Sequence, residues 1–223
     1  MQLVHFSIEL EFDKSTRLHT PAQKVFTALG GKTLKTKPRE PGTNIRNEKQ
    51  KNLINWQYEK CGIGLEKTED PIECMRIMTQ LMETIDNVAP IGKLQSTKIV
   101  TGWILPAPRH DFASLNELYM HTSISPKEFM QGTYDSSVIL DSEIDDFIFH
   151  HQSGPMTQKQ LLEEYLIYKR DNLPKVLIFL YTSATYTKVI NYNKKEMHSV
   201  IENAFGLCER HSNSFSKIWE GYL

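Results

Sequence analysis

The longest unbroken run of large apolar side chains in the sequence is Val176–Tyr181, inside the segment 175–186. A β-strand directs alternate residues to opposite faces, so an unbroken run indicates a strand that is covered on both sides. The run is too short to cross a membrane, which takes about 20 apolar residues. We therefore expect 175–186 to be the central strand of a sheet, with the long amphipathic helix predicted at 194–220 as part of its cover.

The pattern of the first hundred residues predicts the element order β-α-loop-β-α-β. Strict alternation of apolar and polar residues up to Asp13 predicts a strand with one buried face, and the residues at 20–23 are typical of a helix start. Residues 53–66 predict a second strand, in which a change of phase near Glu59 indicates a bulge. A helix start at residues 70–73 and a strand at 97–105 complete this half.

The pattern of the second half predicts a short helix, a hairpin and a capped helix. The strand 175–186 and the helix 194–220 follow them. The helix is expected at 111–121, and the hairpin is expected to turn at 141–143. The next helix begins with a capping signal at Thr157 and is expected to reach 171–172.

The proline-containing segment 105–108 divides the chain into a half at 1–106 and a half at 107–223. The fold class that follows is α+β. We expect two α/β halves of similar size that share or abut a mostly antiparallel sheet, with the helices packed on one face.

Composition predicts the cellular location of the protein and little about its chemistry. The net charge is −1, which does not favour binding of a polyanion by the molecule as a whole. Cys61, Cys74 and Cys208 form no Cys-x-x-Cys pair, which favours reduced thiols in a cytoplasmic protein. The alternating N-terminus has no basic region before its apolar residues, which is typical of a strand and not of a signal peptide. We expect no membrane association, and the oligomeric state is left open.

The segment 32–51 differs from the rest of the chain in its charge. It carries seven basic and two acidic residues, a local charge of +5 that leaves −6 on the remainder. With little apolar content, such a segment is most often a mobile, solvated connection. The functional alternative is an arm that binds the phosphates of a nucleic acid. Its candidate contact residues are Lys32, Lys35, Lys37, Arg39, Arg46, Lys49 and Lys51.

Two tripeptides have the His-x-Ser form found in two-histidine phosphoesterases, in which one histidine acts as base and the other as acid. The first pairs His121 with Ser123, and the second pairs His151 with Ser153. Their separation of thirty residues is short for such enzymes, so a hydrolase or phosphodiesterase is the alternative hypothesis and not the preferred one.

Other candidate sites have simpler structural interpretations. The acidic residues between 135 and 146 lack the spacing of an EF-hand, and a charged hairpin turn accounts for them. His198 and Glu202 are four residues apart on the last predicted helix but lack a third metal ligand. No P-loop, Gly-x-Ser-x-Gly, His-Glu-x-x-His or dinucleotide-binding motif is present. The sequence therefore predicts no metal and no cofactor.

One block of the sequence resembles a known family. Residues 98–106, Lys-Ile-Val-Thr-Gly-Trp-Ile-Leu-Pro, are followed by the short helix pattern at 111–119. This strand, turn and helix resemble a sporadically distributed family of bacterial proteins, and the first strand and the last helix are similar in pattern. The resemblance implies an accessory function such as phage defence or a toxin–antitoxin system, and it implies no catalytic residues. We accordingly expect a non-enzymatic binding or regulatory module that acts through a protein or nucleic-acid partner.

Overall fold

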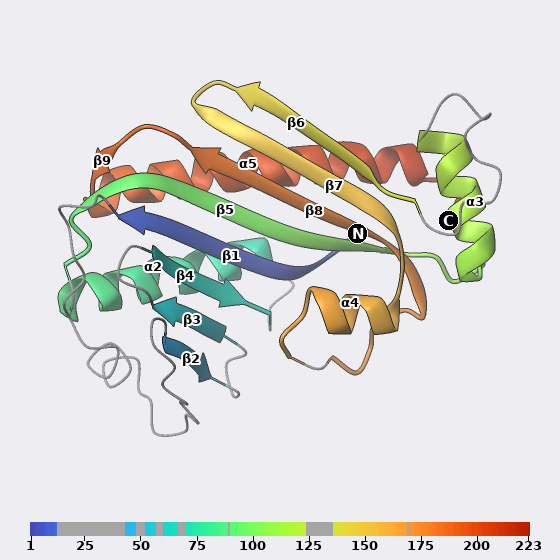
Figure 1. The fold of residues 1–223 in the computed structure, drawn as a ribbon, viewed down its shortest axis with the longest axis horizontal. Helices are drawn as coiled ribbons and strands as arrows, with labels where there is room; N and C mark the ends of the chain where they lie inside the picture. Colours follow the sequence, from blue (N-terminus) through green and yellow to red (C-terminus); the bar gives the residue numbers. More distant parts are fainter. Residues whose placement is uncertain are drawn as a thin grey trace.

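The computed structural model describes residues 1–12, 43–47, 52–56, 60–66, 70–88, 90–123, 136–168 and 170–223 (Figure 1). Its strands form one antiparallel sheet in the order β2-β3-β4-β1-β5-β8-β7-β6, with β9 paired to β5. The fold is α+β, as the sequence predicts. The strands are β1 (Gln2–Phe12), β2 (Thr43–Asn47), β3 (Asn52–Trp56), β4 (Lys60–Leu65), β5 (Lys93–Pro106), β6 (Val138–Ile144), β7 (Phe147–Thr157), β8 (Val176–Tyr186) and β9 (Ile190–Asn191).

The strand expected to be central is confirmed as β8, which lies between β5 and β7. A helix covers one of its faces, and a second helix covers one end of the other. Ile178 packs with Trp219 of α5 (Lys194–Trp219) on one side. Leu177 and Phe179 pack with Leu161 of α4 (Gln158–Glu164) on the other.

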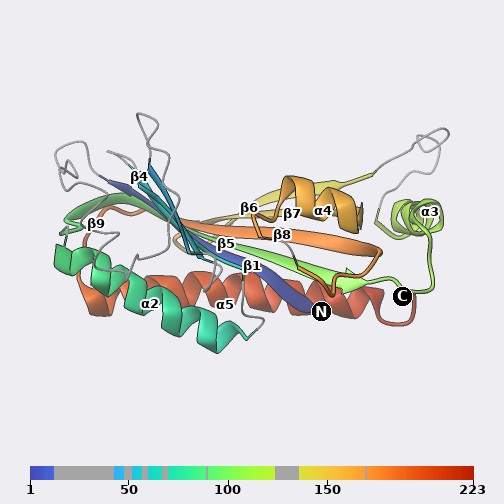
Figure 2. The same ribbon diagram turned by 90° about the horizontal axis from the view of Figure 1, so that it is seen from below.

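The two long helices lie side by side on one face of the sheet, as Figure 2 shows. These are α5 and α2 (Pro71–Val88). The short helix α4 lies on the opposite face, and α3 (Phe112–Ser123) lies at one end and packs on β7. Helices therefore occur on both faces, with the larger cover on one. None of the described helices has the length and apolar composition needed to cross a membrane.

The helix starts follow local capping chemistry. The Asn193 side chain accepts a hydrogen bond from the backbone N–H of Glu196 at the start of α5, and the amide of Asn193 donates to the Glu196 carboxylate. Thr157 and Gln160 form the predicted capping box of α4. At α2, the carboxylate of Asp70 accepts from the backbone N–H of Ile72.

Two predicted strand boundaries are wrong. Residues 53–66 were expected to form one bulged strand, but β3 and β4 form an antiparallel hairpin in which Trp56 pairs with Cys61. The change of phase near Glu59 therefore reflects a reversal of the chain. The second hairpin turns at Asp145 and Asp146, and not at 141–143, which lies within β6. Asp145 has φ of 52°, a conformation that aspartate adopts more readily than most residues.

The helix expected to extend from Thr157 to 171–172 ends at Glu164. The backbone N–H groups of Ile167 and Tyr168 donate to the buried carboxylate of Glu66. Those groups would be needed for the next turn of a helix, so a contact from a distant strand end terminates α4.

The proposed halves lie in one continuous sheet, because β5 of the first half pairs with β8 of the second from Thr97 to Pro106. The largest core cluster also spans both halves: β1 and α2 contribute to it together with β8 and α5. The division at 106 stays a prediction. The helix expected near 20–30 lies outside the described residues.

Candidate functional site

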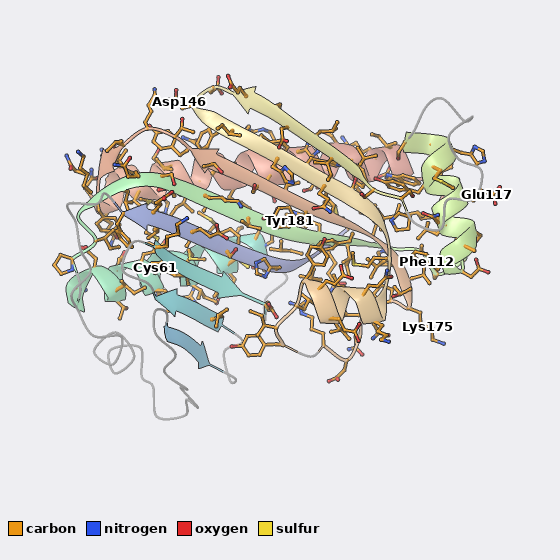
Figure 3. All side chains as sticks on the ribbon, viewed as in Figure 1. Cys61, Phe112, Glu117, Asp146, Lys175 and Tyr181 are labelled. Atoms are coloured by element: carbon orange, nitrogen blue, oxygen red, sulfur yellow. The ribbon has the colours of Figure 1, made fainter. Side chains whose placement is uncertain are left out.

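The candidate site is the face of the sheet opposite α2 and α5, here named the open face. Phe6 and Ile8 belong to the core beneath α2 and α5, so His5 and Ser7 project from the open face. The same alternation places Lys98 and Tyr181 on this face. Figure 3 shows Tyr181 near the middle of it, and α4 covers one end.

A groove of about 490 Å³ lies on the open face over β5, β7 and β8. Its apolar and aromatic surfaces come from Ile148, Tyr165 and Tyr181, and the edge of the Tyr181 ring lies near His150. The remaining side chains supply hydrogen-bond donors and acceptors. Apolar walls with a few polar groups are typical of ligand and peptide sites. The lining residues are Lys98, Ile148, His150, Gln152, Tyr165, Tyr181, Ser183 and Thr185.

Carboxylates lie close to two lysines of the described open face. The Lys98 ammonium lies 3.9 Å from a Glu9 oxygen, and that of Lys60 lies 3.8 Å from a Glu11 oxygen. At the edge of the sheet, Asp141 is exposed and its carboxylate lies 2.6 Å from Nδ1 of His150. Glu143 is exposed on the same side of β6. The described part of this face therefore does not favour a polyanion, and its β6 edge is acidic.

A second group on the open face joins β1 to the end of β4. Nε2 of His5 lies 3.1 Å from Oγ of Ser7, two residues along the same strand face. Nδ1 of His5 is buried, has no hydrogen-bond partner among the described residues and lies 3.5 Å from Oε1 of Glu66. The Glu66 carboxylate is itself fixed by the backbone N–H groups of Ile167 and Tyr168. The serine hydroxyl, the imidazole and the carboxylate thus lie in a row, with the hydroxyl and the carboxylate on opposite sides of the imidazole.

Glycines on both neighbouring strands leave room for the His5 side chain. A Cβ added to Gly102 of β5 would lie 3.2 Å from Cβ of His5, closer than nearly all ordinary Cβ contacts. A Cβ added to Gly64 of β4 would lie 3.7 Å from Cε1 of His5, at ordinary contact distance. The imidazole is therefore enclosed by backbone on both sides.

A polar chain lies beneath the sheet, between β7 and α5. Nδ1 of His151 lies 2.6 Å from Nε2 of His211, and Nε2 of His151 lies 2.7 Å from Oγ of Ser153. The Tyr119 hydroxyl is 2.7 Å from that Oγ and donates to the Ser153 carbonyl. Burial first, and then the proximity of His211 and of His150, lower the pKa of His151 to about 4. The chain is neutral at pH 7.

The four residues of the phosphodiesterase hypothesis occupy different environments. His121 is exposed on α3, where Nε2 lies 3.8 Å from a Glu117 carboxylate, and Ser123 is exposed at the end of that helix. His151 and Ser153 are buried. The contacts described for His151 join it to Ser153 of β7 and to His211 and Phe215 of α5.

Most of the basic segment lies outside the described residues. Lys32, Lys35, Lys37, Arg39, Lys49 and Lys51 are among those outside, whereas Arg46 lies in β2 and its backbone pairs with Leu53. The expectation that 32–51 is a connection is therefore wrong for 43–47. The apolar pattern did not predict β2, which is the last strand at its end of the described sheet and pairs with β3.

Two of the acidic candidates, Asp141 and Asp146, take part in ion pairs. Asp146 lies 2.7 Å from the Lys188 ammonium, and Asp141 contacts His150. His198 and Glu202 form a 3.3 Å ion pair on α5. Within the described residues, no three His, Cys, Asp or Glu side chains are placed to bind a metal ion.

The sequence interpretation missed the group formed by His5, Ser7 and Glu66. A signal was present, since His5-Phe6-Ser7 has the same His-x-Ser form as the two tripeptides discussed above. In a strand, residues two apart share a face, so this form places an imidazole beside a hydroxyl wherever it occurs in a strand. Glu66 carries no such signal, because its position depends on how β4 pairs with β1.

No protein-family model matches the chain, and no curated protein matches it. Among solved structures, the chain is similar to "Methanococcus jannaschii TBP", with 10% sequence identity and a TM-score of 0.31. The alignment covers 90% of this chain and 95% of that chain. At that TM-score the likeness carries no inference about fold or function.

Proposed function

We propose that this chain is a binding module whose open face accepts a segment of a partner protein. The observation that carries the proposal is the groove over β5, β7 and β8, with its aromatic and hydrogen-bonding walls. Exposed Ile148 and Ile139 extend the apolar surface from the groove to the β6 edge. A broad polar and aromatic surface of this kind is typical of peptide recognition.

Charge complementarity supports a partner segment that carries Lys or Arg beside apolar residues. Asp141 and Glu143 are exposed at the edge of the groove, whereas Lys98 is paired with Glu9. β6 is the last strand at this end of the described sheet, and all its residues from Ile139 to Glu143 are exposed. An extended peptide laid along such an edge gains backbone hydrogen bonds as well as side-chain contacts. By the family resemblance, the expected setting is a bacterial accessory system.

Nucleic acid is the second candidate partner, because residues 32–51 carry a charge of +5. That charge lies on a different part of the chain from the groove. The two candidates therefore predict different contact sites.

Site-specific photo-crosslinking in the cells that express the protein tests the proposal. A benzoyl-phenylalanine at Ile148 is compared with one at Ile218, an isoleucine of similar exposure on α5. We expect a discrete adduct from position 148 that nuclease leaves unchanged, and none from position 218. Equal adducts from both positions, or none from position 148, would contradict a binding site on the open face. An adduct that nuclease shortens would identify nucleic acid as the partner.

A further inference from the structure

The group formed by His5, Ser7 and Glu66 has the order of atoms that activates a serine. The hydroxyl of a nucleophilic serine contacts Nε2 of a histidine, and a carboxylate faces Nδ1 of the same ring. Here the corresponding separations are 3.1 Å and 3.5 Å. Catalytic contacts of this kind are often long without substrate and shorten when it binds, so 3.5 Å is compatible with such a role.

The Glu66 carboxylate is held in place beside Nδ1 of His5. Glu66 is buried, and three hydrogen bonds from the backbone N–H groups of Ile167 and Tyr168 hold both of its oxygens. Nδ1 of His5 is also buried, and the described part of the chain gives it no other partner. A proton on Nδ1 would face the carboxylate, which leaves the lone pair of Nε2 free to accept the proton of Ser7.

Ser7 lies on the same face as the groove. Ser7 pairs with Val100 of β5, and Val100 pairs with Ser183 of β8, which lines the groove. Two strand spacings separate Ser7 from Ser183, a distance of about 10 Å. A small ester whose apolar part lies in the groove is long enough to bring its carbonyl to Ser7. Lys98 lies diagonally from Ser7 on β5, with its ammonium 3.9 Å from a Glu9 oxygen.

We propose that Ser7, His5 and Glu66 form a nucleophilic centre that hydrolyses carboxylic esters with an apolar or aromatic group. Oγ of Ser7 attacks the acyl carbon while Nε2 of His5 takes the hydroxyl proton. The bond from the acyl carbon to the alcohol oxygen breaks, and the alcohol leaves with the proton from His5. Water then attacks the acyl-serine through the same histidine, which releases the carboxylic acid and restores Ser7. Glu66 is a positioning residue in this scheme.

The inference differs from the binding function and is tested separately. The purified chain is treated with a fluorophosphonate, which transfers its phosphonyl group to an activated serine as fluoride leaves. The labelled residue is identified by peptide mass spectrometry, and hydrolysis of p-nitrophenyl butyrate is followed in parallel. Ser7→Ala and His5→Gln remove the nucleophile and the base. Ser214→Ala, which changes an exposed serine on α5, and Ser153→Ala beside the buried His151 are the matched controls.

We expect a label on Ser7 that disappears in Ser7→Ala and persists in both controls. Removing a general base lowers rates by about 100-fold or more, so His5→Gln should slow labelling and ester hydrolysis by that factor. In Glu66→Gln, nitrogen NMR of the His5 ring should show that the ring no longer carries its proton on Nδ1 alone. Labelling of Ser7 should slow by about tenfold or more. An unlabelled Ser7, an equal rate in His5→Gln, or labelling spread evenly over several serines would each overturn the proposal. Unfolding curves of the variants distinguish loss of chemistry from loss of fold.

Discussion

Nδ1 of His151 lies 2.6 Å from Nε2 of His211, so a hydrogen bond between two imidazoles joins β7 to α5. His151 is 3% exposed, and its other nitrogen contacts Ser153. When both rings are neutral, each hydrogen bond in the chain from Tyr119 to His211 has one proton and one acceptor. Protonation of His151 would make both of its ring nitrogens donors and would place a positive charge in this buried chain.

Acid should therefore weaken the fold through His151. Its pKa falls from 6.5 to about 4 on folding, and burial also lowers the pKa of His211. Between these pH values the unfolded chain binds more protons than the folded chain, so the stability present above pH 6.5 is lost as the pH falls toward 4. The expected loss is about 2–3 kcal/mol.

Urea unfolding at pH 7 and pH 4.5 checks this expectation. His151→Asn should lose most of the additional acid sensitivity, although its stability at pH 7 should be lower. His121→Asn, which changes an exposed histidine, should retain the pH dependence of the native chain. If His151→Asn kept the full acid sensitivity, other groups would be responsible.

Trp219 anchors the end of α5. Its ring stacks on Tyr119 with a centroid separation of 5.3 Å, and it packs in one cluster with Ile178 of β8. Trp219→Ala should lower the free energy of unfolding by about 3–5 kcal/mol, since a large buried side chain is lost. Ile218→Ala, one residue away and 58% exposed, should change it little. An unchanged denaturation midpoint for Trp219→Ala would show that this end of the helix is peripheral.

Two glycine substitutions should have opposite effects. A methyl group at Gly102 would lie 3.2 Å from both His5 and Phe179, and overpacking of this kind should destabilise Gly102→Ala by about 1–3 kcal/mol. A methyl group at Gly206 in α5 would meet only the flexible end of Arg210. Gly206→Ala should therefore stabilise the chain by about 0.5–1 kcal/mol, because alanine favours the helix. Thermal or urea unfolding of the two variants gives the signs, and a stabilising Gly102→Ala would show that His5 moves freely.

The basic segment predicts salt-dependent binding if nucleic acid is the partner. Affinity for a mixed oligonucleotide should fall with a logarithmic slope of about −0.7 to −0.9 per phosphate contacted. Excision of 35–49 is unsuitable because it would remove β2, so Lys35, Lys37 and Arg39 are each changed to Gln. This triple variant should bind more weakly and show a shallower slope. Equal binding by both proteins, or no binding at low salt, would remove nucleic acid as a candidate.

The sequence determined those elements whose pattern is local. Alternation identified β1, an unbroken apolar run identified β8, and a regular stripe behind Asn193 identified α5. Each of these signals depends on the side-chain period of the element or on a hydrogen bond within one turn, so distant contacts are not needed to detect it. The antiparallel α+β class followed from the same signals.

The tertiary structure alone decided where strands pair and which polar groups meet. The chain reversals near Glu59 and at Asp145, and the early end of α4, depend on contacts that no local period records. His5 and Ser7 are neighbours by strand geometry, and that much was readable from the sequence. Glu66 reaches them only because β4 pairs with β1, and His211 reaches His151 only because α5 packs beneath β7. Local periodicity fixes the direction of a side chain, whereas its partners depend on the register and packing of elements far apart in the chain.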